Sequence, residues 1–227
     1  MFQVEEQAQR ALEILEAAGY EAYLVGGCVR DLLAGEIPHD YDLATNALPE
    51  AVKEVFSFCR VIDTGIRHGT VTVILEDLPM EITTYRQEGD YSDRRRPDSV
   101  LFVKTLAEDL ARRDFTINAM AWHPAKGLVD PYGGKRDYGA GILRCVGDPD
   151  TRFREDALRM LRALRFVSML RFGLEPETEA ALFRQKEGIL QLAPERIAAE
   201  LNRIICGRAA GAVLLQYVEI LAVAIPE

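Results

Sequence analysis

The stretch from Tyr23 to Asp42, YLVGGCVRDLLAGEIPHDYD, constrains the fold more than any other part of the chain. An apolar strand over residues 23–25 is interrupted by two glycines and followed by a short helix predicted over residues 28–34. Glycine lets a ligand approach the backbone closely, and a helix N-terminus presents free N–H groups and the positive end of its dipole. The pattern therefore predicts a phosphate-binding turn at Gly27, to which Arg30 adds a charged contact.

A second strand is predicted to follow this helix and to carry Asp40 and Asp42. Residues i and i+2 of a strand share a face, so both carboxylates would point the same way. Two oxygen ligands with open positions suit Mg²⁺, which takes few protein ligands and completes its shell with substrate phosphates. A glycine pair alone is usually a simple turn and Asp-x-Asp a solvated loop. The two together, with an arginine between them, indicate a phosphate site beside a metal site.

Residues 80–85, MEITTY, alternate polar and apolar side chains and predict another strand. Glu81 lies on this strand, and a third carboxylate on a neighbouring strand would make a fuller metal site. Taken alone, Glu81 is explained more simply by an outward-facing strand position. Short neighbouring strands, with helices predicted over residues 3–18 and 48–56, indicate an α+β fold in which helices cover one face of a mixed sheet.

Two arginine-containing segments have open roles. The polar stretch 87–99 predicts a loop, in which Arg94–Arg96 would either close over a bound nucleotide or form a solvated surface. Arg113 and Asp114 follow a helix predicted over residues 106–112, and they would form either a structural ion pair or part of a nucleotide site. Both alternatives stand for each segment on the residues alone.

The composition changes near residue 148, beyond which we predict no strand but helices over residues 153–172, 176–184 and 194–205 and an apolar helix beginning over 209–225. Residues 151–208 hold eleven Arg/Lys and eight Asp/Glu, a net charge of +3 within a chain of net charge −9. The overall charge argues against a general nucleic-acid coat protein. A mildly basic helical part beside an acidic metal site fits specific contacts to a polyanion.

Asp156 and Arg159 are three residues apart in the first of these helices, so we expect them on one helical face. A carboxylate can only accept hydrogen bonds and a guanidinium can only donate them. Cytosine and adenine each present an amino donor beside a ring-nitrogen acceptor, whereas uracil and guanine present a carbonyl beside a ring N–H. The pair therefore favours C and A over U and G, because mismatched groups stay unpaired or repel.

Arg162 and Arg165 continue the same spacing. Each step of three residues falls short of a full turn by about 60°, so Arg165 lies about half a turn from Asp156. Long arginine side chains would reach a base at one end and phosphates or RNA farther along. A helix of surface salt bridges, including Glu155–Arg159 and Asp156–Arg159, explains the same pattern without any ligand.

Cellular location is indicated by several features together. The four cysteines are far apart and lack metal-ligand spacing, which is typical of free thiols in a reducing compartment. The N-terminus has neither the basic region nor the apolar core of a signal peptide. The most apolar run, residues 209–225, is interrupted by Gln216 and Glu219 and is too short for a convincing span. We therefore expect a cytoplasmic protein without a membrane span.

Ordered motifs over residues 20–205 resemble one family, the class II (bacterial-type) tRNA nucleotidyltransferases, which include CCA-adding enzymes and poly(A) polymerases. The matching segments are LVGGCVRDLLAG, HDYDLATNALPE, DTGIRHGTV, MEITTYR, RRDFTINAM, DPYGGKRD, REDALRMLRALRF and PERIAAEL. The resemblance implies a polymerase-beta-like head with a mixed sheet, followed by a helical neck. We expect the catalytic head over residues 1–147, the neck over 148–208 and the start of a truncated helical body over 209–227.

The resemblance also implies roles for the residues singled out above. Gly27 and Arg30 would bind the triphosphate, and Asp40 and Asp42 would hold two Mg²⁺, with Glu81 a less certain third carboxylate. The other implied contacts are Arg113 to the nucleotide, Asp114 and Asn118 near the ribose, Asp156 and Arg159 as the protein template for the base, and Arg162 and Arg165 lining the nucleotide site.

The activity implied is in-line, two-metal transfer of C and A from CTP and ATP to the 3′ end of tRNA, without a nucleic-acid template. A CC-adding, A-adding or poly(A) polymerase relative is the alternative within this class. Poly(A) enzymes usually carry an Arg-rich stretch in place of DTGIRHGTV, and the loop with Arg94–Arg96 disfavours CC-only addition. A non-catalytic nucleotide-binding or interaction module is the alternative from another class. Because family members continue into tRNA-binding domains, we expect a fragment or a shortened variant, with an unknown oligomeric state.

Overall fold

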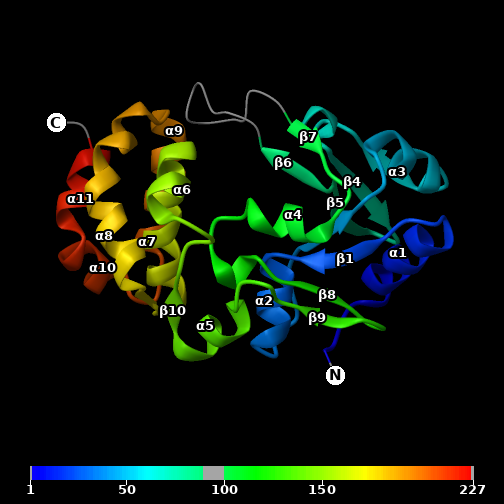
Figure 1. Cartoon of the computed structure of the whole chain (residues 1–227), viewed down its shortest axis with the longest axis horizontal. Helices are drawn as coiled ribbons and strands as arrows, with labels where there is room; N and C mark the ends of the chain where they lie inside the picture. Colours follow the sequence, from blue (N-terminus) through cyan, green and yellow to red (C-terminus); the bar gives the residue numbers. More distant parts are fainter. Residues whose placement is uncertain (1, 89–99, 226–227) are drawn as a thin grey trace. The chain divides into compact units, whose positions relative to one another are not determined.

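A computed structural model of the chain describes residues 2–88 and 100–225 (Figure 1). Arg94–Arg96, expected in a loop that would either close over a nucleotide or form a solvated surface, lie outside the described residues. The described chain forms two compact units. The first unit holds residues up to 88, residues 100–113 and Ile117–Lys135, and the second holds Asp114–Thr116 and the residues from 136 onward.

The first unit is built on a seven-stranded sheet of order β3-β4-β5-β2-β1-β8-β9. Strands β2 and β5 run parallel, and the other neighbouring pairs are antiparallel. The predicted mixed sheet is therefore confirmed. Its strands are β1 Ala22–Val25, β2 Tyr41–Thr45, β3 Arg60–Ile62, β4 Thr70–Leu75, β5 Leu78–Thr84, β8 Ala121–His123 and β9 Gly127–Val129.

One face of this sheet is covered by α1 Glu6–Ala17, α2 Gly27–Leu33 and α3 Pro49–Val55. Apolar side chains of these helices share one core cluster with the alternate strand residues Leu24, Leu43 and Ile82. The strand residues of opposite parity, Val25 and Ala44 among them, pack with α4 Leu106–Ala111 on the other face. Because Asp42 has the parity of Ala44, the polar strand residues lie on the face that α1–α3 leave uncovered.

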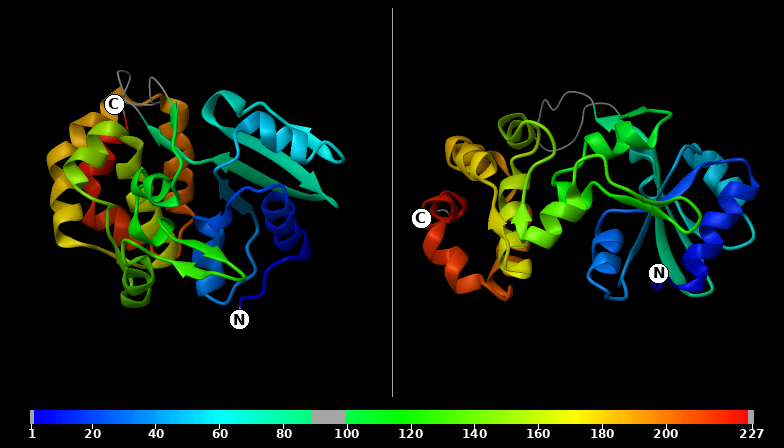
Figure 2. Two further views of the ribbon diagram at one scale, coloured as in Figure 1. Left: turned by 45° about the vertical axis from the view of Figure 1, so that its right-hand side comes forward. Right: turned by 60° about the horizontal axis from the view of Figure 1, so that its bottom comes forward.

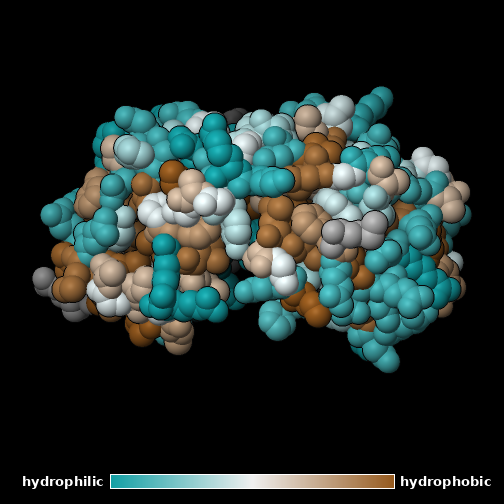
Figure 3. All heavy atoms as spheres, turned by 90° about the horizontal axis from the view of Figure 1, so that it is seen from below, coloured by the Kyte–Doolittle hydropathy of each residue, from teal (hydrophilic) through white to brown (hydrophobic). Residues whose placement is uncertain are grey.

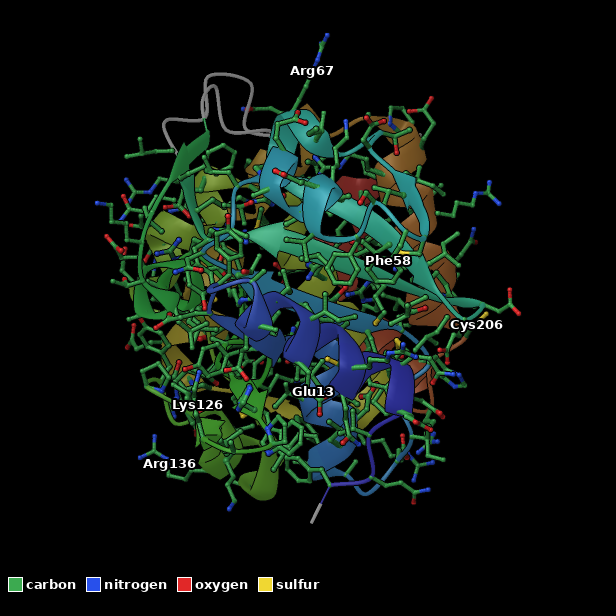
Figure 4. The ribbon with its side chains drawn as sticks, turned by 90° about the vertical axis from the view of Figure 1, so that its right-hand side faces the viewer. Glu13, Phe58, Arg67, Lys126, Arg136 and Cys206 are labelled. Carbon is green, nitrogen blue, oxygen red and sulfur yellow. The ribbon has the colours of Figure 1, made fainter. Side chains whose placement is uncertain are left out.

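A small hairpin stands beside this sheet, formed by β6 Arg86–Glu88 and β7 Val100–Phe102. The expectation of a loop over residues 87–99 is wrong at its start, because Gln87 pairs with Leu101 in this hairpin. The hairpin is tied to the 3₁₀ turn Ile66–His68, since Arg86 Nη1 donates to the carbonyl oxygen of His68. Arg67 of the same turn is exposed and projects outward (Figure 4).

The second unit is mainly helical, and its helices α6 to α11, coloured yellow-green to red, gather into one bundle (Figures 1 and 2). The elements are α5 Gly134–Ala140, α6 Pro149–Glu155, α7 Leu158–Leu170, α8 Pro176–Gln185, α9 Pro194–Ile205, α10 Ala210–Gln216, α11 Val218–Ala224 and the 3₁₀ segment Lys186–Gln191. Two short strands, β10 Ile142–Leu143 and β11 Gly173–Leu174, pair in parallel. This pairing joins Ile142–Leu143 to the helical part of the second unit. The expectation of no strand beyond 148 is wrong at β11.

The single helix expected over residues 153–172 is also wrong. It is divided into α6 and α7 at Asp156, whose backbone is extended with φ −138° and ψ 106°. The Asp156 side chain satisfies the start of the next helix by accepting from the Leu158 N–H at 3.0 Å. Arg171, at φ 59° in the left-handed region, ends α7 one residue after Leu170.

The apolar run over residues 209–225 forms two short helices, α10 and α11, instead of one. Tyr217 lies between them, buried, with its hydroxyl donating to Glu179 at 2.7 Å. Apolar side chains remain exposed on α10 and α11, among them Leu215 and Val218, and Figure 3 shows apolar surface in this part of the molecule. Within residues 2–88 and 100–225, no helix combines the length and apolar character needed to cross a membrane.

Candidate functional site

The glycine turn predicted between the first strand and helix is present between β1 and α2. Gly26 has φ 73° and ψ −130°, a backbone conformation that side chains other than glycine rarely adopt. A Cβ on Gly26 would lie 3.0 Å from Nη1 of Arg113 and 3.8 Å from Oδ2 of Asp42. The structure thus brings the turn, an arginine and an aspartate together. Gly26, more than Gly27, is the position where the geometry requires glycine.

Arg30 lies on the first turn of α2, beside the glycines. A Cβ on Gly27 would be 3.6 Å from its Nη2. The guanidinium donates to Oδ1 of Asn118 at 2.9 Å and to Oδ1 of Asp31 at 2.8 and 3.1 Å. These two contacts hold the positive charge next to the turn, where a phosphate would meet it.

The predicted carboxylates lie at the face of the sheet opposite α1–α3. Asp42 lies in β2 with Tyr41 and Leu43 buried on the opposite face, while Asp40 is exposed and just precedes the strand. Glu81 is the register partner of Asp42 on the parallel strand β5, so the two side chains lie side by side. Burial and the charge of Glu81 raise the pKa of Asp42 to about 6, with Arg113 opposing the shift and Asp40 adding to it. The carboxylates therefore repel one another, and a bound cation would relieve that repulsion.

The donor set fits a divalent cation that uses few protein ligands. Among the described residues, no three His, Cys, Asp or Glu side chains are close enough together to hold a metal ion. Glu81 therefore does not complete a three-carboxylate site with Asp40 and Asp42 in this arrangement. Two aspartates with hard oxygen atoms remain, and Mg²⁺ at such sites takes its other ligands from water and phosphate oxygens.

Arg113 is held by Asp109, a residue that the sequence patterns did not single out. Oδ2 of Asp109 accepts from Nη2 of Arg113 at 3.1 Å, and Oδ1 accepts from Nε and Nη2 of Arg112 at 3.0 and 2.9 Å. Burial alone would raise the pKa of Asp109, but the two arginines lower it below the usual range. The spacing of Asp109 to Arg112 (i, i+3) and to Arg113 (i, i+4) in the sequence indicates these ion pairs, but it does not indicate that Asp109 is buried.

Asp114 belongs to the second unit, where it pairs with Arg162. Oδ2 of Asp114 accepts from Nε of Arg162 at 2.8 Å, and Oδ1 accepts from the Phe115 N–H at 2.8 Å. Asp114 raises the pKa of Arg162.

Arg165 is mostly buried and stacks on Phe166, with its Cζ 4.5 Å from the ring centroid. Its Nη1 donates to Oε1 of Glu200 on α9 at 3.2 Å. Burial and the nearby charge of Arg162 lower the pKa of Arg165 to about 10. Arg162 and Arg165 therefore lie in the same cluster on α7, each with an acidic partner.

Asp156 and Arg159 are near one another, but they do not share one helical face as expected, because Asp156 is extended and precedes α7. The N–H of Arg159 donates to the carbonyl oxygen of Asp156 at 3.0 Å across the first turn of α7. The Asp156 carboxylate accepts from Nη2 of Arg196 on α9 at 3.2 Å, while Nη1 of Arg159 donates to Oε2 of Glu155 at 2.5 Å. The expected Glu155–Arg159 pair is thus present, and Asp156 has a partner from another helix.

Family models match most of the chain. The Poly A polymerase head domain model matches residues 22–144, and a model described as "Probable RNA and SrmB- binding site of polymerase A" matches residues 171–227. The chain is 49% identical to the CCA-adding enzyme of Lacticaseibacillus paracasei over 208 residues, which are 92% of this chain and 52% of that protein. It is 52% identical to the CCA-adding enzyme of Lactobacillus helveticus over 198 residues, covering 87% of this chain and 49% of the relative.

Solved structures agree with these matches. The CCA-adding enzyme of Bacillus stearothermophilus in complex with CTP superposes with a TM-score of 0.86 at 42% identity, over 94% of this chain and 51% of that chain. The Thermotoga maritima CCA-adding enzyme complexed with tRNA_CCA gives a TM-score of 0.77 at 27% identity, over 94% of this chain and 50% of that chain. The chain spans about half the length of the curated relatives it matches.

Proposed function

This chain belongs to the class II CCA-adding enzyme and poly(A) polymerase family of nucleotidyltransferases, and we propose that it transfers C and A to the 3′ end of tRNA from CTP and ATP without a nucleic-acid template. The single observation that carries the proposal is the meeting of Arg113 and Asp42 at Gly26, where a Cβ would lie 3.0 Å from Nη1 of the arginine and 3.8 Å from Oδ2 of the aspartate. A glycine turn flanked by a carboxylate and a guanidinium suits a metal-bound triphosphate.

In the proposed reaction the 3′-oxygen of the RNA forms a bond to the α-phosphorus of the nucleotide as the bond between that phosphorus and the β-phosphate oxygen breaks. Pyrophosphate leaves with the bonding electron pair, and the hydroxyl proton passes to solvent. Asp40 and Asp42 would hold Mg²⁺, which when bound lowers the pKa of the attacking hydroxyl and neutralises charge on the triphosphate. Gly27, Arg30 and Arg113 bind and orient the phosphates, which aligns the α-phosphorus for in-line attack.

Selection of the base is assigned to the second unit. Asp156 accepts and Arg159 donates, which matches the amino group and ring nitrogen shared by cytosine and adenine. Arg162 and Arg165 supply positive charge farther along α7, each balanced by an acidic partner. Base choice then depends on the protein, with no nucleic acid strand to copy.

In this proposal residues 1–147 form the catalytic head, 148–208 the neck and 209–227 the start of a further helical body. The match of residues 171–227 to a probable RNA-binding site supports tRNA contact through the later helices. A tRNA substrate also favours a cytoplasmic location. The alternatives within the family, CC-only, A-only or poly(A) addition, differ in product and not in this site.

Primer extension tests the proposal. Purified protein with Mg²⁺ is given tRNA lacking one, two or three terminal nucleotides, with each triphosphate supplied separately. We expect incorporation from CTP and ATP in the order that restores CCA, and none from UTP or GTP. Long A tails on unrelated RNA would indicate poly(A) synthesis, and no transfer on any substrate would leave a nucleotide-binding module.

A further inference from the structure

Helix α9 packs along α7 and presents charged side chains to it in a complementary order. Arg196 and Glu200 are four residues apart, so they share one face of α9. Arg196 donates to Asp156, and Glu200 accepts from Arg165. Asp156, just before α7, thus pairs with a basic residue of α9, and Arg165 within α7 pairs with an acidic residue of α9.

The orientation of the Asp156 side chain depends on its contact with Arg196, because Asp156 lies outside both α6 and α7. Its backbone is extended between α6 and α7, so the side chain is not fixed by a regular helical environment. Two hydrogen bonds hold the carboxylate: Oδ1 to the Leu158 N–H at 3.0 Å and Oδ2 to Arg196 Nη2 at 3.2 Å. The contact with Leu158 is local in sequence. The contact with Arg196 sets the direction in which Oδ2 of Asp156 faces. Both side chains are largely buried, at 17% exposure for Asp156 and 22% for Arg196.

The arginine is poorly explained as a stabilising residue alone. Its Nη1 is buried and has no hydrogen-bond partner within residues 2–88 and 100–225. A buried donor without a partner destabilises the fold, so packing by itself favours a smaller or apolar side chain here. An arginine at this position is explained if its role is to hold the carboxylate of Asp156.

We propose that Arg196 is a positioning residue for base selection, which fixes the carboxylate of Asp156 so that one oxygen accepts from the amino group of cytosine or adenine. The inference rests on the proposed function and deepens it. Discrimination by hydrogen bonding requires a fixed acceptor, because a carboxylate free to rotate admits water or an alternative contact in place of the correct base. Removing the arginine therefore loosens base choice before it abolishes transfer.

Arg196→Ala, Arg196→Lys and wild type are compared in single-turnover extension of tRNA lacking its terminal nucleotides, with CTP, ATP, UTP and GTP supplied separately. Affinity for CTP and UTP is measured by equilibrium titration of the same proteins, which needs no catalysis. We expect Arg196→Ala to lower the preference for C and A over U and G about tenfold, the size of a modest specificity contact. Arg196→Lys should recover part of it, since lysine keeps the charge but not the planar fork.

The matched control is Arg184→Ala. Arg184 also pairs with an aspartate of another helix in the same unit, Asp150 of α6. It should leave base preference unchanged, and thermal melting of each variant shows whether the fold is retained. In an Asp156→Ala background, Arg196→Ala should add no further loss of preference.

Unchanged base preference in Arg196→Ala, with preference lost in Asp156→Ala, would overturn the positioning role while leaving the proposed function intact. An additive further loss in the double variant would overturn it as well, because Arg196 would then act independently of Asp156. Wild-type protein that neither transfers nor binds CTP in preference to UTP would instead overturn the proposed function, and this inference with it.

Discussion

The carboxylate of Asp109 has no exposed surface and accepts a hydrogen bond from Arg113 at 3.1 Å. The other terminal nitrogen of Arg113, Nη1, lies against the turn at Gly26. One buried acid therefore sets the position of the arginine that faces the glycine turn. The same carboxylate accepts from the backbone N–H of Arg86 at 3.4 Å, which ties the β6–β7 hairpin to the same point.

Asp109→Asn tests this support through its pH dependence. The folded pKa of Asp109 lies below its ordinary value of about 3.9, so its charge stabilises the fold above that value and the benefit is lost as the pH falls through the folded pKa. We expect the variant to lose roughly 3 kcal/mol near pH 7, as when one partner of a buried ion pair is removed. Denaturant unfolding between pH 3 and 7 should show that the difference from wild type shrinks at the acid end.

Asp63→Asn is the control for Asp109→Asn. The pKa of Asp63 is also lowered, by its hydrogen bond with Lys53, but the pair is on the surface. Exposed pairs contribute little to stability, so this variant should unfold like wild type at every pH. Equal pH profiles for Asp109→Asn and wild type would contradict the role given to Asp109.

Gly26→Ala combines backbone strain with a steric contact to Arg113, and substitution of Gly35 allows the two effects to be separated. The φ of 73° strains any side chain, and the added Cβ would lie 3.0 Å from Nη1 of Arg113. We expect a loss of about 1–3 kcal/mol in stability together with weaker binding of CTP, because the arginine must move. Gly35→Ala has φ 75° but nothing within 4 Å of the new Cβ, so it should lose stability and keep its CTP affinity. Equal CTP affinities in both variants would contradict the placement of Arg113 at the turn.

Much of the first unit was predictable because its signals are local. Alternation in MEITTY placed Glu81 on β5, and the glycine pair between apolar strand and helix placed the turn. Asp40 was expected on the strand but lies just before it, where its side chain remains exposed. The pairing of Asp42 with Glu81 needed the parallel register of β2 and β5, which no local pattern specifies.

The second unit departed from prediction where long-range contacts override local periodicity. The helical apolar pattern continues through Asp156, yet the helix is interrupted there. Asp156 accepts hydrogen bonds from the N–H of Leu158 and from Arg196, forty residues away. Strand β11 has two residues and exists only through its pairing with β10, so it carries no periodic signal. The Asp109–Arg113 spacing was readable, but the burial that makes Asp109 important was not.

Asp42→Asn should remove transfer while sparing the fold. Loss of a group that stabilises transition-state charge lowers the rate by roughly three orders of magnitude. Near pH 7 without divalent metal, the variant should melt no lower than wild type, because it removes a half-buried charge beside Glu81. Glu81→Gln should lower the rate less, since no three-carboxylate site is formed in the described chain. Transfer by Asp42→Asn at the wild-type rate would contradict the metal assignment.

Asp156→Ala should relax base choice without unfolding the second unit. The residue lies between helices, so its removal interrupts no helical hydrogen bond, although it leaves Arg196 and the Leu158 N–H without one partner each. We expect UTP and GTP to be used at about a tenth or more of the CTP rate, because hydrogen-bonded discrimination is replaced by shape alone. Single-turnover extension with each triphosphate gives the ratio. Asp150→Ala is the control, since it removes an inter-helix carboxylate bound to Arg184 and Gln185 and should leave that ratio unchanged. Retained selection of C and A in Asp156→Ala would show that the base is chosen elsewhere.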